Sequence, residues 1–191
     1  ALDSLTSGNF NTVFGAKALT ANTEGSFNVA AGRLALTSNT TGQHNAAIGS
    51  DALQGNTTGS YNTALGNTAL GLNTTASNNT AVGYQSLYAN TTGADNVAVG
   101  YGALDANTTG SYNIAVGLNC LTANTTASGN NAFGHAALQS NTTGANNTSV
   151  GFLSLQANTT ASNNTAVGYQ AGYGATGSNS TFVGYQTGFA T

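Results

Sequence analysis

The chain has 191 residues, with only two Lys or Arg and five Asp or Glu, a net charge of −3, 26 Gly, one Cys and no Pro. Two basic side chains cannot neutralise a run of phosphates, so the composition excludes a nucleic-acid-binding protein of ordinary electrostatic design. No stretch approaches the ~18 consecutive apolar residues of a transmembrane helix, so we expect no membrane insertion.

Glycine recurs with a period of seventeen residues. Residues 79–95, NTAVGYQSLYANTTGAD, are the clearest copy of the repeat. A short fixed period is typical of repeat proteins in which each unit contacts only its neighbours. We therefore interpret residues 1–191 as a single repeat domain and, from the partial repeats at its two ends, as a segment of a longer fibre. The glycines are Gly15, Gly32, Gly49, Gly66, Gly83, Gly100, Gly117, Gly134, Gly151 and Gly168, followed after sixteen residues by Gly184.

The residues just before each glycine predict a β-strand. We call the apolar position directly before the glycine the pre-glycine column, and the small residue before that the alanine column. Alternation along a strand places the two columns on opposite faces. We expect the pre-glycine column to face inward. The alanine column then either faces outward, where another chain can approach, or contacts a second strand of its own coil. The pre-glycine column is Phe14, Ala31, Ile48, Leu65, Val82, Val99, Val116, Phe133, Val150, Val167 and Val183, and the alanine column runs from Ala30 to Ala166 with Ser149 as its exception.

Leucine stands four residues after nine successive glycines, from Leu19 to Leu155. Two apolar columns at one period describe the inside of a solenoid whose coils stack at strand spacing. The sequence therefore predicts an all-β fold, a parallel β-solenoid (β-roll) of about ten 17-residue coils, each with two or three short strands. The ten intervals from Gly15 to Gly184 give a rod of roughly 48 Å at strand spacing.

An Asn-Thr-Thr corner follows the leucine in most coils. Its asparagines, and a second column through Asn11, Asn28, Asn45 and Asn164, predict ladders of amide hydrogen bonds along the axis. The same corners also match the Asn-x-Thr acceptor pattern, so glycosylation is the alternative interpretation. The candidate acceptors are Asn39, Asn56, Asn73, Asn90, Asn107, Asn124, Asn141 and Asn158.

Tyrosine occurs in the columns that follow no rule of size or polarity. Tyr combines apolar area with a polar tip, so exposed Tyr columns suggest a contact surface for a sugar or a protein. The alternative is that these rings cover strand edges or fill a subunit interface. The candidates are Tyr84, Tyr101, Tyr169 and Tyr185 directly after a glycine, Tyr61 and Tyr112 five residues before one, and Tyr88 and Tyr173 five residues after one.

The sequence suggests no catalytic, metal or cofactor site. His44 and His135 occupy different columns, so they suggest neither a metal cluster nor a catalytic pair. Cys120 replaces the Ala or Ser of its column and is interpreted as a small packing residue. We therefore expect neither enzyme activity nor a cofactor.

The element Asn-Thr-Ala-Val-Gly-Tyr, at residues 79–84 and 164–169, resembles the Ser-Val-Ala-Ile-Gly element of YadA-like head repeats. These occur in trimeric autotransporter adhesins and in phage tail fibres, and the likeness covers nearly the whole chain. The resemblance implies a left-handed β-roll, three chains packed side by side, and a role in attachment. The family's head repeats are usually shorter, and the longer Asn-Thr-Thr-Gly corner accounts for the difference.

Three functions follow as hypotheses. The first is a structural fibre or adhesin segment of an extracellular, cell-surface or virion appendage, a homo-oligomer with the trimer favoured, binding a cell-surface glycan or protein receptor. The second is an ice-binding solenoid that uses the Thr columns running from Thr23 to Thr159 and from Thr41 to Thr160. The third is a self-assembling extracellular filament subunit. No charged residue occurs from Ala106 to Thr191, so either other chains or a hydrophilic coat should cover that surface.

Overall fold

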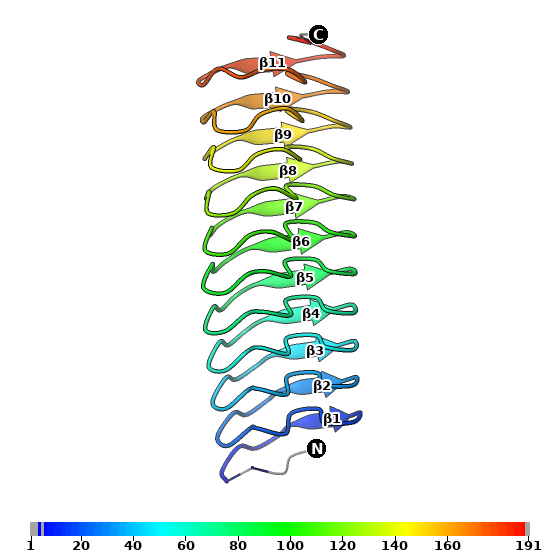
Figure 1. Ribbon diagram of the computed structural model, residues 1–191, viewed down its shortest axis with the longest axis vertical. Coiled ribbons are helices and arrows are strands. Elements are labelled where there is room, and N and C mark those ends of the chain that lie inside the picture. The colour runs from blue at the N-terminus through cyan, green and yellow to red at the C-terminus, as the bar shows by residue number, and fades with distance from the viewer. Residues whose placement is uncertain (1–3, 5, 190–191) are drawn as a thin grey trace.

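Seventeen-residue coils stack into a rod built on one parallel sheet (Figure 1). The computed structural model describes residue 4 and residues 6–189. Val82 pairs with Val99, its equivalent in the next coil, which confirms the predicted vertical stacking and the parallel β-solenoid of about ten coils. The strands pair in chain order as β1 (Thr12–Phe14), β2 (Val29–Ala31), β3 (Ala46–Ile48), β4 (Thr63–Leu65), β5 (Thr80–Val82), β6 (Val97–Val99), β7 (Ile114–Val116), β8 (Asn131–Phe133), β9 (Thr148–Val150), β10 (Thr165–Val167) and β11 (Thr181–Val183).

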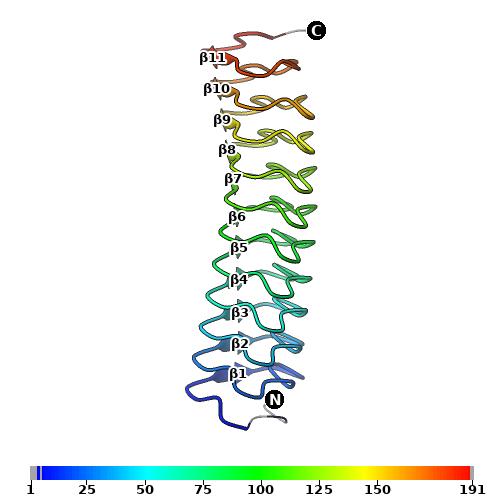
Figure 2. The ribbon, with the colours of Figure 1, turned by 90° about the vertical axis from the view of Figure 1, so that its left-hand side faces the viewer.

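Each coil contains one strand, so the expectation of two or three strands per coil is wrong. The remainder of the coil is a series of turns, which Figure 2 shows on the side of the rod opposite the strands. In the coil after β5, Gln85 and Leu87 have φ of 54° and 52°, in the left-handed region. A strand requires negative φ, so these positions break any second strand. The turns still bond between coils, because the Leu87 N–H donates to the Ala103 carbonyl at 2.9 Å.

Glycine ends each strand because neighbouring coils approach too closely there for a side chain. Gly100 has φ of 134°, and a Cβ on it would lie 2.5 Å from the carbonyl oxygen of Gly117 in the next coil. The neighbour is backbone, which cannot move aside as a flexible side chain can. The period of the glycines is therefore a direct consequence of axial stacking.

The core of the rod is a narrow column of leucine and alanine. The leucines four residues after glycine are fully buried, as predicted, and the alanine column lies in the same core cluster. Cys120 is also fully buried in its column of Ala and Ser, which confirms its interpretation as a packing residue. The buried leucines are Leu19, Leu36, Leu53, Leu70, Leu87, Leu104, Leu121, Leu138 and Leu155.

The two faces of the strands are the reverse of our expectation. The pre-glycine column faces outward, and Leu65 on β4 is 45% exposed. The alanine column faces inward, so the outward interpretation of its small side chains is also wrong. A coil this small encloses little volume, and the leucine already occupies the space opposite the strand. From β2 to β10 the inner face carries only Ala or Ser, and the larger residues are placed outside.

Both asparagine columns form hydrogen-bonded ladders, as predicted. Asn107 Nδ2 donates to Asn90 Oδ1 and to the Gly110 carbonyl, each at 2.9 Å. In the second column, the Asn113 backbone N–H donates to Asn96 Oδ1 at 2.9 Å. All these side chains are buried, so the ladders satisfy polar groups that would otherwise be costly inside the rod.

The leucine column ends near the C-terminal coil, where Gly172 replaces leucine. Phe182, on the inner face of β11, fills the vacated space: a Cβ on Gly172 would lie 2.8 Å from Phe182 Cδ2 and 3.0 Å from Leu155 Cδ2. This last coil is one residue shorter, and Val167 pairs with Val183 sixteen residues on. The aromatic ring thus closes the C-terminal end of the Leu and Ala core.

Replacing Leu104 by Asp should unfold the adjacent coils, because it places an unpaired charge in a site with no exposed surface. Replacing Tyr101 by Ser, in the same coil but 53% exposed, should leave the fold intact. Thermal unfolding followed by circular dichroism measures both variants. Equal melting temperatures would contradict the assignment of inside and outside.

Candidate functional site

Large side chains directly after the glycines form a continuous exposed ridge in the C-terminal two-thirds of the rod. Adjacent rings stack: Tyr84 on Tyr101, Phe152 on Tyr169, and Tyr169 on Tyr185, each with centroids 5.3 Å apart. The ridge continues for seven successive coils without a small or charged side chain. We call it the post-glycine ridge; its members are Tyr84, Tyr101, Leu118, His135, Phe152, Tyr169 and Tyr185.

A second aromatic ladder occupies the first coils, in the column five residues before the glycines. Phe10, Phe27, His44 and Tyr61 stack in that order, with centroids 5.0, 4.8 and 5.0 Å apart. Sequence reasoning considered only tyrosine and therefore missed the other three rings. The period would have revealed them, because every aromatic residue of one column falls on the same line along the axis.

The eight candidate tyrosines do not form one surface. Four belong to the post-glycine ridge and Tyr61 belongs to the N-terminal ladder. Tyr112 is 67% exposed, in a column where its neighbours are Asp95 and Gly129. The Tyr88 ring lies over Gly71, and Tyr173 stacks on Phe189 at 5.2 Å.

Stacking limits what these rings can bind. A ring inside a stack has both faces covered by its neighbours, and presents only its edge and, in Tyr, its hydroxyl. Sugars bind aromatic side chains mainly through a free ring face. The interior rings of the ladders, such as Tyr169 between Phe152 and Tyr185, are therefore better suited to edge and hydroxyl contacts than to sugar stacking.

The outward face of the sheet is a second candidate surface, and sequence reasoning placed it inside. Its pre-glycine column presents Ile48, Leu65, Phe133, Val150 and Val167, each at least 37% exposed. The first residue of each strand points the same way. That first residue is Thr or Asn in seven of the eleven strands. The strand face therefore carries one apolar stripe, the pre-glycine column, beside a mostly polar column, and both follow the whole sheet.

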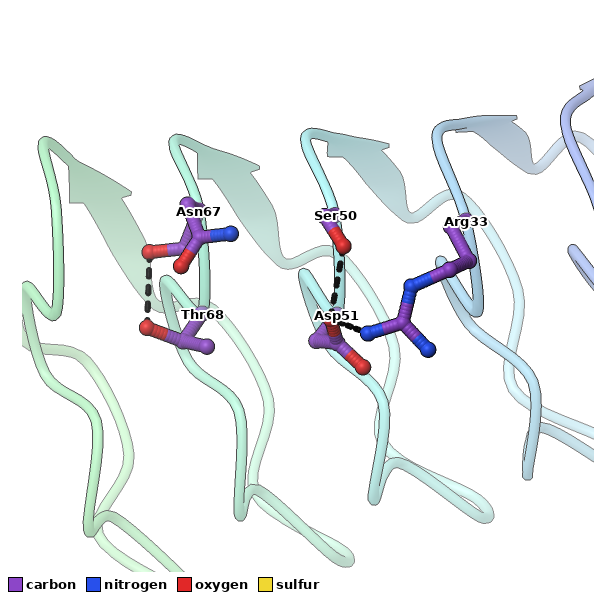
Figure 3. A network of polar contacts seen from close by, with 5 residues as sticks. All are labelled: Arg33, Ser50, Asp51, Asn67 and Thr68. Atoms are coloured by element: carbon purple, nitrogen blue, oxygen red, sulfur yellow. Dashed lines mark hydrogen bonds and ion pairs between the residues drawn. The ribbon is translucent and has the colours of Figure 1, made fainter.

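The charged side chains occur only up to Asp105, and the one ion pair among the described residues lies in the first coils. In Figure 3, the Arg33 guanidinium meets the Asp51 carboxylate at 2.6 Å, and the Ser50 hydroxyl donates to the same carboxylate oxygen at 2.6 Å. Arg33 and Ser50 occupy the column that becomes the aromatic ridge from Tyr84 onward. The rod is therefore polar at one end of this column and aromatic at the other.

The candidate glycosylation sites lie inside the coils. Asn39, Asn56, Asn73, Asn90, Asn107, Asn124, Asn141 and Asn158 are all fully buried, and each Nδ2 donates within the ladder. A glycan is attached at this nitrogen. Attaching a glycan to a folded coil would break these hydrogen bonds. The buried geometry therefore disfavours glycosylation of the folded chain.

The two threonine columns of the corners differ in their availability. In the first, the hydroxyl bonds to the backbone, as in Thr91, which donates to the Thr108 carbonyl at 3.0 Å. In the second, residues such as Thr92 and Thr109 are exposed. One column of free hydroxyls remains at this corner, in place of the paired array that the ice-binding hypothesis needs.

The described coils have neither a surface pocket nor a cluster of potential metal ligands, that is, of three or more His, Cys, Asp or Glu side chains. Burial raises the pKa of the Cys120 thiol to about 12, so it stays protonated and unreactive at neutral pH. No helix in the described part of the chain has the length and apolar character needed to cross a membrane.

Comparison of the chain with protein-family models, with curated proteins and with solved structures gave no match.

Asp105 is a carboxylate in an unfavourable position. Burial raises its pKa, partly offset by hydrogen bonds from backbone N–H groups, and its Oδ1 has no hydrogen-bond partner among the described residues. The folded chain therefore holds this proton more tightly than the unfolded chain. Its contribution to stability is fully present below the unfolded pKa and is lost as pH rises from there through the higher folded pKa.

Gln occupies the position equivalent to Asp105 in two later coils, as Gln139 and Gln156. Replacing Asp105 by Gln should raise the melting temperature at pH 7. The gain should shrink below about pH 4, where the unfolded Asp is protonated as well. Calorimetry at pH 7 and pH 3 tests this. An equal gain at both pH values would contradict the electrostatic explanation.

Proposed function

We propose that this chain is a rigid segment of an attachment fibre on a virion or cell surface, and that its rods associate side by side with copies of the same chain. The observation that carries the proposal is the apolar pre-glycine column on the exposed strand face. Parallel sheets are almost always covered on both faces. Here the coil's own Leu and Ala side chains cover one face, while the pre-glycine column of the other face presents mainly Val, Ile, Leu and Phe to solvent.

A copy of the chain is the partner that matches this face best. The stripe repeats at the strand spacing over eleven strands, roughly 48 Å. A partner that covers all of it needs the same period, and the chain itself has that period. The stripe also carries no charge in β1 to β11, so bringing two such faces together leaves no buried charge unpaired.

Attachment follows from the resemblance to YadA-like head repeats at residues 79–84 and 164–169. That resemblance favours three left-handed chains per fibre, an extracellular location, and a glycan or protein receptor on a cell surface. The absence of charge from residue 106 onward is consistent with surfaces that are covered in the assembly. A filament that grows end to end is the alternative assembly, and it predicts a different mass behaviour.

Sedimentation should give a single mass of three chains, independent of concentration. Replacing both Leu65 and Val150 by Asp should reduce the mass to one chain with an unchanged circular dichroism spectrum, because both side chains lie on the exposed strand face. The matched control replaces Thr58 and Thr143 by Asp, on the exposed corner of the same two coils, and should keep the assembled mass.

A wild-type chain that is monomeric at every concentration would overturn the proposal, as would assembly that survives the change at Leu65 and Val150. A mass that rises continuously with concentration would instead support the filament.

A further inference from the structure

Four of the eight tyrosines have another tyrosine stacked on them in the adjacent coil. The Tyr84 and Tyr101 rings have centroids 5.3 Å apart with 21° between their planes, and the Tyr169 and Tyr185 rings are 5.3 Å apart at 9°. Tyr61 stacks on His44 and Tyr173 on Phe189, while Tyr88 and Tyr112 have no tyrosine in the neighbouring positions of their columns.

The stacking brings matching atoms of each pair together. Two nearly parallel rings that are related by one step of the solenoid have each ring carbon displaced by about the same vector as the centroids. The carbons ortho to the two hydroxyls are therefore adjacent. All four rings are between 43% and 73% exposed, so an oxidant can reach them and the rings can turn toward each other.

We propose that Tyr84–Tyr101 and Tyr169–Tyr185 are sites of intrachain dityrosine formation by a peroxidase with hydrogen peroxide. Each phenol loses one electron and one proton, and the two phenoxyl radicals form one carbon–carbon bond between their ortho carbons. The hydrogens on those carbons then move to the oxygens, which restores both phenols. The two electrons and two protons removed reduce one hydrogen peroxide to two water molecules.

These bonds would tie together coils that no disulfide can join, because the single cysteine is buried. Each coil contacts only its neighbours, so a solenoid can unravel from its end. The bond between Tyr169 and Tyr185 links β10 to the last coil, where the leucine column has already ended. A covalent loop of this length restricts the unfolded chain and so stabilises the folded one.

Horseradish peroxidase and hydrogen peroxide, applied to the dilute chain, test the proposal by peptide mass spectrometry and dityrosine fluorescence. We expect two linked peptide pairs, Tyr84–Tyr101 and Tyr169–Tyr185, each lighter by two hydrogen atoms, in a product that runs as one chain on a denaturing gel. The linked product should also melt at a higher temperature than the untreated chain.

Tyr101→Phe keeps the stacked ring and removes the phenol, so it should abolish the first link and leave the second. Tyr112→Phe is the matched control, since Tyr112 is exposed but unpaired, and both links should persist. The absence of both linked peptide pairs would overturn the proposal. Links that are found only in covalent dimers of the chain would also overturn it. Neither outcome depends on whether the rods associate as a fibre.

Discussion

Axial stacking at a fixed offset of seventeen residues is the constraint on which the whole rod depends. Each coil has one strand of three residues, which has no stability alone, and its backbone groups are satisfied by the coils before and after it. Any change of length would move leucine, asparagine and glycine out of their columns together. The last coil shows the cost of a deviation: it is one residue shorter, and Phe182 rather than leucine closes the core there.

The backbone itself is unfavourable in places, and the repeat compensates for it. The buried leucines adopt φ near 50°, a conformation that costs of order 1–3 kcal/mol for a residue with a side chain. Burial of each leucine offsets this with about 1.5–3 kcal/mol. The asparagine ladders add hydrogen bonds between buried groups, as in Asn90 and Asn107. A coil is thus stable only in a stack, which explains why the same residue types recur in every copy.

The sequence predicted the columns well and their direction less well. Leucine, glycine and asparagine are each required by one geometric condition, so their recurrence was sufficient to place Leu104, Gly100 and Asn107 correctly. The inner and outer faces of the strand could not be assigned in this way, because alternation separates Val99 from Ala98 without indicating which of them is inside. Apolarity favoured Val99, but the interior is too narrow for it. The stacked rings were missed because sequence reasoning considered only tyrosine, although the period places Phe, His and Tyr of one column on the same line.

Distances between exposed residues at equivalent positions of different coils test the stacking most directly. Pulsed electron paramagnetic resonance can measure them between nitroxide labels on cysteines placed at Thr58, Thr126 and Thr160, in a Cys120→Ala background. The stacked rod predicts label separations near 19 Å for four coils and near 29 Å for six, increasing linearly with the number of coils at about 4.8 Å each. Separations that do not increase linearly with coil number would contradict the solenoid.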